Sequence, residues 1–103
     1  MHLDQESLTM VHDILKEHVP EYEVWAFGSR VHGRNLKKFS DLDLVIINHS
    51  PLKPLQLFNL KEAFSESDLP IMVDVLAWDE VDKNFRKIIL REHEIIQSKQ
   101  EHI

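Results

Sequence analysis

The segment Ser40-Asp41-Leu42-Asp43-Leu44-Val45-Ile46-Ile47 joins two acidic residues to an uninterrupted apolar run, and it decides the fold. The apolar run is typical of a strand that is buried on both faces. Side chains at positions i and i+2 lie on the same face of a strand, so Asp41 and Asp43 should point the same way, with their Cα atoms roughly 7 Å apart. We therefore expect a strand over residues 42–48 that begins beside two carboxylates.

Strands and helices are expected to alternate on either side of that strand. Apolar runs predict the strands, and helical spacing of apolar residues predicts the helices. Phe58 and Phe64 are the expected core anchors of the third helical segment. The predicted order is helix, strand, short helical turn, strand, helix, strand and helix, over residues 4–18, 21–27, 29–34, 42–48, 55–67, 71–78 and from Asp79 or Asp82 to about Lys99.

The composition of the whole chain narrows the class of protein. A length of 103 residues suits one domain, which we place over residues 1–103. The absence of Cys excludes disulfides and thiolate zinc sites, and a net charge of −6 disfavours broad binding to nucleic-acid backbones. Residues 1–10 lack the apolar centre of a signal peptide, and no run approaches the roughly 18 apolar residues of a membrane span. We therefore expect a cytoplasmic location.

The third predicted strand contains a single acidic residue, Asp74, within the apolar sequence Ile71-Met72-Val73-Asp74-Val75-Leu76-Ala77-Trp78. A carboxylate inside a buried strand costs several kcal/mol unless it is paired or bound to a metal. If this strand neighbours the one that follows Asp41, the three carboxylates can converge on one face. A hard divalent cation, Mg²⁺ or Mn²⁺, would relieve their repulsion, and two such ions suit an in-line displacement at phosphorus. Pairing of Asp74 with Arg86 or Arg91 is the structural alternative.

A turn and a basic segment lie between the first two predicted strands. Gly28 and Ser29 break the first strand, and the backbone of a glycine can approach a phosphate closely while a serine offers a hydroxyl. The following residues, up to Ser40, include four cations, Arg30, Arg34, Lys37 and Lys38, and no acid. These cations could neutralise phosphate oxygens. A plain turn and a solvated basic loop are the alternatives, but the combination with the three acids favours a site for a small polyanion.

Three motifs resemble the minimal nucleotidyltransferases of the DNA polymerase β superfamily. They are Trp25-Ala26-Phe27-Gly28-Ser29-Arg30-Val31-His32-Gly33, Ser40-Asp41-Leu42-Asp43-Leu44 and Val73-Asp74-Val75, with eleven residues between Ser29 and Asp41. The resemblance implies an α+β (mixed α/β) fold, a small mixed sheet with helices mainly on one face. It also implies that Asp41, Asp43 and Asp74 are catalytic and bind the metal ions, and that Gly28, Ser29, Arg30 and Ser40 bind the nucleotide.

The same resemblance implies a reaction and a partner. Single-domain relatives pair with all-helical HEPN proteins in toxin–antitoxin modules, and some transfer AMP from ATP to a partner tyrosine. We therefore expect a metal-dependent transfer of NMP from an NTP, ATP first of all, to a hydroxyl on a HEPN partner. The alternative is a subunit without catalysis that neutralises the HEPN protein by binding it.

Overall fold

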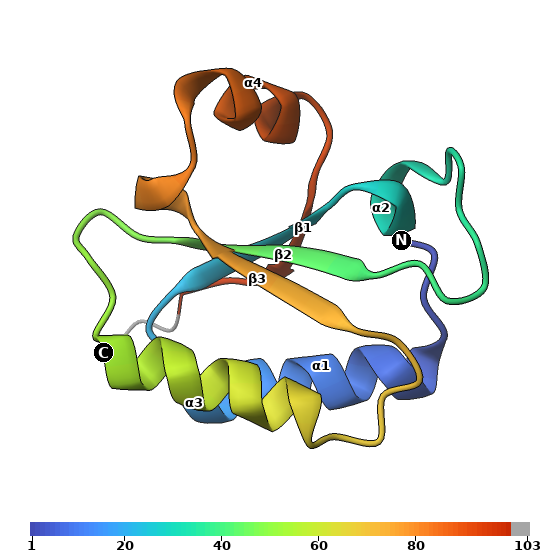
Figure 1. Ribbon diagram of the computed structural model, residues 1–103, viewed down its shortest axis with the longest axis horizontal. Coiled ribbons are helices and arrows are strands. Elements are labelled where there is room, and N and C mark those ends of the chain that lie inside the picture. The colour runs from blue at the N-terminus through green and yellow to red at the C-terminus, as the bar shows by residue number, and fades with distance from the viewer. Residues whose placement is uncertain (100–103) are drawn as a thin grey trace.

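The computed structural model describes residues 1–99, which form a sheet with helices on both of its faces (Figure 1). The helices are α1 (Gln5–His18), α2 (Ser29–His32), α3 (Pro54–Ser65), the 3₁₀ turn η1 (Trp78–Glu80) and α4 (Lys83–Arg91). The strands are β1 (Glu23–Phe27), β2 (Leu42–Ile47), β3 (Val73–Ala77) and β4 (Glu94–Gln97). Residues 100–103 of the expected 1–103 domain lie outside the described part of the chain.

The sheet is mixed, as expected, and has the strand order β3-β2-β1-β4. Strand β1 is antiparallel to both β2 and β4, whereas β2 and β3 are parallel. A parallel pair needs a long crossover connection, which α3 provides here. The register sets Asp43 of β2 opposite Phe27 on one side and opposite Asp74 on the other. Sheet pairing therefore brings together residues that are far apart in the sequence.

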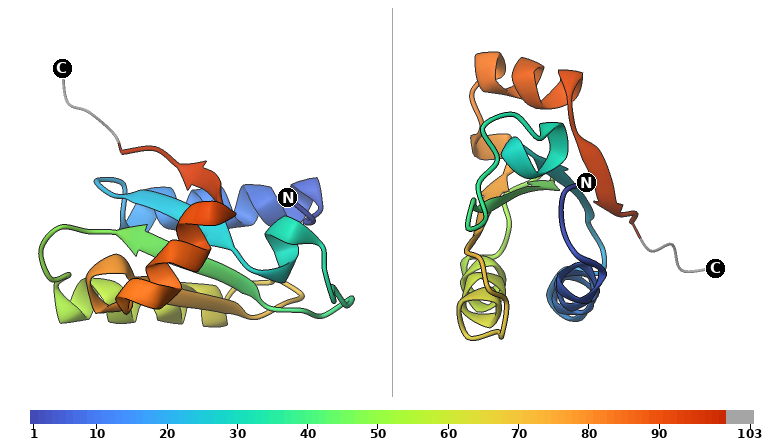
Figure 2. Two further views of the ribbon diagram at one scale, coloured as in Figure 1. Left: turned by 90° about the horizontal axis from the view of Figure 1, so that it is seen from above. Right: turned by 90° about the vertical axis from the view of Figure 1, so that its right-hand side faces the viewer.

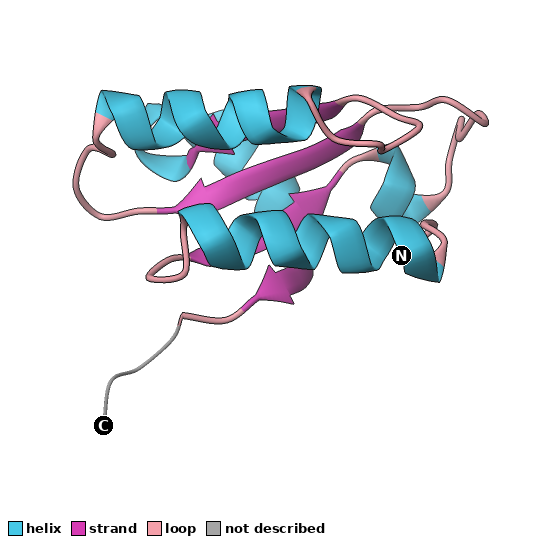
Figure 3. Cartoon of the chain, turned by 90° about the horizontal axis from the view of Figure 1, so that it is seen from below, coloured by secondary structure: helices cyan, strands magenta, loops and turns pink. Residues whose placement is uncertain are grey.

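Helices α1 and α3 run side by side under one face of the sheet, as views from the side and from below show (Figures 1 and 3). They bury most of the apolar core against it, including Leu15 of α1, Leu60 of α3 and Leu44 of β2, which have no exposed surface. Helix α4 crosses the opposite face, on the side where the short α2 and η1 also lie (Figures 1 and 2). The expectation of helices mainly on one face is thus confirmed for the two long helices, α1 and α3, and α4 lies on the other face. None of the helices within residues 1–99 combines the length and apolarity needed to cross a bilayer.

The predicted C-terminal helix is too long at its end. Asp82 caps α4 by accepting the N–H of Phe85 at 2.9 Å, as proposed, but the helix ends at Arg91. The chain becomes extended at Glu92 (φ −151°), and the segment around Ile95 pairs with the free edge of β1. A β-branched Ile-Ile pair fits both a helix stripe and a strand, and the unpaired edge of β1 decides between them.

The prediction for Phe58 is also wrong. Its side chain is 58% exposed, whereas Phe64 on the same helix is buried, as expected.

Trp25 and Trp78 pack edge to face, with ring centroids 5.5 Å apart. Their rings therefore contribute to packing within the fold.

Arg30 holds together the loop that joins α2 to β2, residues 33–41, which we call the basic loop. Its side chain is 8% exposed, and each guanidinium nitrogen donates to a backbone carbonyl. The acceptors are the carbonyls of Ser40 (3.1 Å), His2 (3.0 Å) and Lys38 (2.9 Å). These three bonds tie the basic loop and the N-terminal segment to α2, and the assignment of Arg30 to nucleotide binding stays a prediction.

We expect replacement of Arg30 by Met to lower the free energy of unfolding by about 2–4 kcal/mol, because three carbonyls lose a charged donor. Arg30→Lys should still lose about 1–2 kcal/mol, since an ammonium keeps the charge but cannot span all three acceptors. Urea denaturation measures both variants, with Lys38→Met as the control that removes an exposed cation from the same loop. Equal stability of Arg30→Lys and the wild type would show that charge alone matters.

Candidate functional site

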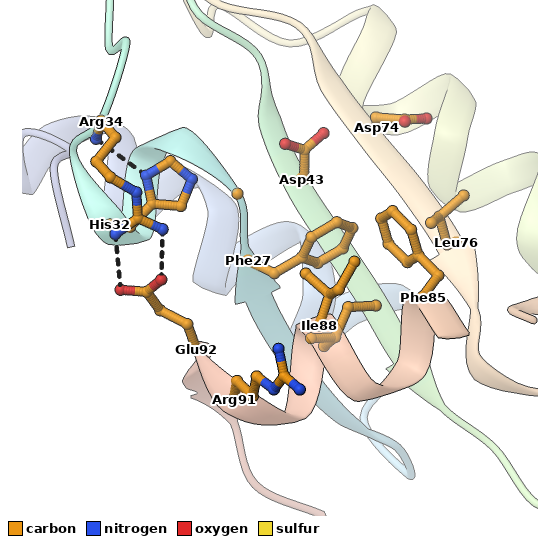
Figure 4. Close-up of a pocket in the computed structure, with 12 residues that line it drawn as sticks. Phe27, His32, Arg34, Asp43, Asp74, Leu76, Phe85, Ile88, Arg91 and Glu92 are labelled. Atoms are coloured by element: carbon orange, nitrogen blue, oxygen red, sulfur yellow. Dashed lines mark hydrogen bonds and ion pairs between the residues drawn. The ribbon is translucent and has the colours of Figure 1, made fainter. Parts of the chain in front are cut away.

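Two of the predicted acids, Asp43 and Asp74, line one cavity of about 480 Å³. They occupy opposite positions in the parallel pairing of β2 and β3, so their side chains lie next to each other on the face of the sheet below α4 (Figure 4). The cavity lies in the size range of small-molecule sites, which is about 300–1,000 Å³. It is therefore large enough for a nucleotide-sized ligand.

The third acid, Asp41, lies just before β2 and is exposed. Within residues 1–99 no group of three or more His, Asp or Glu side chains is arranged to hold one metal ion. The three carboxylates therefore lie near the starts of β2 and β3 but do not form a closed set of ligands around one ion.

Asp74 is exposed, which corrects the expectation of a buried carboxylate. The reason is the face of the sheet, because Asp74 lies on the α4 side (Figure 4), whereas its neighbour Val75 on the same strand is buried in the core. The alternative pairing of Asp74 with arginine is not formed either. Arg86 donates instead to the carbonyl of Trp78, at 2.8 and 3.1 Å, and neither ion pair found in residues 1–99 includes one of the three acids.

Asp43 is the most strongly perturbed of the acids. Its partial burial, with the negative charges of Asp74 and Asp41 adding to the effect, raises the pKa of the Asp43 carboxyl to about 6. Desolvation and like charges both disfavour the ionised form, and neither ion pair within residues 1–99 includes Asp43. The site thus has surplus negative charge at neutral pH.

Gly28 ends β1 with φ +81°, a backbone conformation that side chains with a Cβ rarely adopt. A Cβ atom at this position would collide with the carboxylate of Asp43. The glycine therefore does two things, since it allows the turn into α2 and leaves room for Asp43. It also lines the cavity, so the sequence prediction for Gly28 coincides with the place where β1 meets the acids.

Two other predicted residues, Ser29 and Ser40, are not part of the cavity lining. Ser29 is the first residue of α2, and its carbonyl accepts the N–H of Gly33 at 2.8 Å. Ser40 stabilises the basic loop, because its hydroxyl accepts the N–H of Lys37 at 2.9 Å and its carbonyl accepts from Arg30. Their assignment to nucleotide binding stays a prediction.

Sequence reasoning missed the second wall of the cavity, which α4 supplies. Phe85 packs edge to face on Phe27, with ring centroids 5.7 Å apart, and Ile88 lies beside them (Figure 4). At the other end, Arg34 and Glu92 form an ion pair at 2.7 Å. The high content of apolar residues on one stripe of α4 was a signal for packing, but it did not say which surface α4 would cover.

Comparisons with known proteins identify the family of this chain. The sequence model of the polymerase beta nucleotidyltransferase family matches residues 9–102. A protein of Haemophilus influenzae, named as a probable protein adenylyltransferase MntA, is 52% identical over 98 residues, which cover 95% of this chain and 85% of that protein.

Solved structures show the same fold. A toxin–antitoxin crystal structure with AMP-PNP superposes with a TM-score of 0.71 at 17% identity, over 90% of this chain and 74% of that one. A structure of a tri-AMPylated Shewanella oneidensis HEPN toxin in complex with an MNT antitoxin gives 0.67 at 15% identity, over 95% and 75%. The family match over most of the chain and the 52% identity carry the assignment: this chain belongs to the polymerase beta nucleotidyltransferase family.

Proposed function

We propose that this protein binds a nucleoside triphosphate, ATP first of all, together with Mg²⁺, and transfers the NMP group to a hydroxyl on a HEPN partner protein. The observation that carries the proposal is the pair Asp43 and Asp74, which line one cavity beside Gly28 and take part in neither ion pair of residues 1–99. The MntA relative and the toxin–antitoxin neighbours support the same reading.

The donor set fits a hydrated divalent cation. Mg²⁺ commonly binds through one or two carboxylates and completes its shell with water and substrate phosphates, so an open arrangement is what it requires. Asp41 and Asp43 would hold the cation, with Asp74 at the second carboxylate position of the cavity. One or two such ions, with Mn²⁺ as a substitute, would neutralise the phosphates and polarise the reacting phosphorus.

The residues of the chain then have separate tasks. The backbone of Gly28 and the hydroxyl of Ser29 would hold the terminal phosphates. The acceptor oxygen would attack the α-phosphorus, the bond from that phosphorus to the bridging oxygen would break, and pyrophosphate would leave. Asp74 is exposed at the cavity edge and would take the proton of the acceptor hydroxyl. Positioning and charge neutralisation account for most of the catalysis in such transfers.

A HEPN protein is the proposed acceptor and binding partner, because the structural neighbours include an AMPylated HEPN toxin in complex with its MNT antitoxin. In this role the protein would act as an antitoxin by modifying its partner. A sequence without Cys suits the reducing cytoplasm, where we place this reaction.

Removing the carboxylates should stop transfer without unfolding the chain. We expect Asp41→Asn, Asp43→Asn and Asp74→Asn each to reduce NMP transfer by about 100-fold or more, because each removes charge that binds the cation or takes the proton. Mass spectrometry of the HEPN partner after incubation with ATP and Mg²⁺ measures transfer. Asp13→Asn, on the exposed side of α1, is the control.

Transfer by both Asp41→Asn and Asp43→Asn at the wild-type rate would show that the site is assigned to the wrong residues. The same variants separate modification from simple binding. If Asp43→Asn still protects cells from the HEPN toxin, the protein neutralises its partner by covering it rather than by modifying it.

The raised pKa of Asp43 predicts a pH dependence of stability. Its folded pKa of about 6 exceeds the ordinary 3.8, so the stability it contributes is complete below about pH 4 and is lost as the pH rises through 6. The metal-free Asp43→Asn variant should therefore melt at the same temperature as the wild type near pH 4 and several degrees higher near pH 7. Thermal denaturation followed by circular dichroism measures this difference.

Added Mg²⁺ should raise the melting temperature of the wild type and leave that of Asp43→Asn almost unchanged, because the cation relieves the repulsion that the variant lacks. A difference between the two proteins that is as large at acidic as at neutral pH would contradict the raised pKa.

The two glycines of the turn allow a matched test of the approach between Gly28 and Asp43. Both have positive φ, +81° and +78°, so alanine at either position should cost about 1–2 kcal/mol of stability. The added methyl of Gly28→Ala meets Asp43, whereas that of Gly33→Ala meets the ring of His2. We expect transfer to fall about tenfold or more in Gly28→Ala, because the carboxylate is displaced, and to stay close to wild type in Gly33→Ala. Equal activities in the transfer assay would contradict this role of Gly28.

A further inference from the structure

An ion pair crosses one end of the cavity, between the basic loop and α4. Arg34 follows the end of α2, and Glu92 is the residue that terminates α4. The Nη2 of Arg34 donates to Oε1 of Glu92 at 2.7 Å, and Nη1 donates to Oε2 at 3.5 Å. Both side chains line the cavity and lie face to face across it (Figure 4).

The charges around the cavity are unfavourable for a polyphosphate in this arrangement. The lining residues include three carboxylates, on Asp43, Asp74 and Glu92, and two guanidinium groups, on Arg34 and Arg91. The planar fork of an arginine binds a phosphate in the same two-pronged way as a carboxylate. Glu92 therefore occupies the donors of Arg34 that an incoming phosphate would use.

The Arg34–Glu92 pair can be exchanged at little cost. Its side chains are 65% and 45% exposed, and ion pairs in such surroundings contribute little to stability. Arg30, four residues earlier, is the opposite case, because its guanidinium is buried and bound to backbone carbonyls that cannot move away. Of these two arginines, only Arg34 can leave its partner for a ligand.

We propose that Arg34 is a polyphosphate-binding residue that is paired with Glu92 in the free protein, and that the terminal phosphates of the nucleotide displace the Glu92 carboxylate from it. This inference rests on the proposed function and assigns the phosphate end of the same cavity. The pair then has two effects. It fixes the Arg34 fork beside the cavity before the ligand arrives, and it makes Glu92 a competitor that weakens binding.

Calorimetric titration of Mg²⁺-ATP and of inorganic triphosphate into the full chain tests the exchange. Glu92→Gln should bind both ligands about threefold more tightly, because an exposed ion pair no longer competes. Arg34→Gln should bind both about tenfold more weakly. In a protein that already carries Arg34→Gln, adding Glu92→Gln should not increase the affinity for either ligand, since Glu92 acts through Arg34. Lys16→Gln and Glu62→Gln, on exposed positions outside the cavity lining, control for the change in net charge.

The outcomes separate this inference from the proposed function. Unchanged or weaker binding by Glu92→Gln, or an equal gain by Glu92→Gln with and without Arg34, would overturn the exchange even if NMP transfer is intact. The expected pattern with inorganic triphosphate in a protein that transfers no NMP would support the exchange and count against the enzyme. Failure of the wild type to bind either ligand would overturn both.

Discussion

The carboxylate of Asp43 lies against the backbone of Gly28, and the position of each residue depends on strand register. Pairing of β1 with β2 sets Phe27 opposite Asp43, so the next residue after β1 must turn away without a side chain. Pairing of β2 with β3 sets Asp74 opposite the same Asp43. A slip of one residue in either pairing would turn the acids to the other face of the sheet, under α1 and α3. The carboxylate pair of the cavity therefore depends on both strand registers.

Two arginines in the segment after Gly28 show how burial decides the role of identical side chains. Arg30 is enclosed, and its guanidinium replaces water as the partner of three carbonyls, so it serves the conformation of the basic loop. Arg34 reaches the cavity and is paired only with an exposed carboxylate. The sequence presents both as cations in a basic segment. What separates them is the position of the N-terminal segment, whose His2 carbonyl accepts one of the Arg30 bonds and which no local pattern places there.

The elements that depend on local patterns were predictable, and those that depend on distant surfaces were not. The apolar run of β2, the break at Gly28 and the pair Asp41 and Asp43 follow from spacing alone. The exposure of Asp74 could not be predicted in the same way, because an apolar sequence does not say which face of its strand the helices will cover. The division between α4 and β4 was likewise hidden, since Ile95 and Ile96 satisfy both patterns and the free edge of β1 selects the strand. The aromatic wall of the cavity follows from that division, because α4 ends at Arg91 after crossing the sheet and the chain then rejoins the sheet as β4.

The two walls of the cavity differ in how firmly they are held, and this difference bears on function. The sheet side is fixed by hydrogen-bonded registers and by core residues without exposed surface, such as Leu44. Helix α4 contributes one fully buried residue, Ile89, and is otherwise held by ring contacts, by Arg86 on the Trp78 carbonyl and by the exposed pair with Arg34. Burial, together with the charges of Asp74 and Asp41, meanwhile raises the pKa of Asp43, which costs stability in the free protein at neutral pH. Under the proposals above, a cation bound at the acids would offset the cost of charging Asp43 on the sheet side of the cavity. Phosphates bound to Arg34 would replace the exposed ion pair between Arg34 and Glu92 on the α4 side.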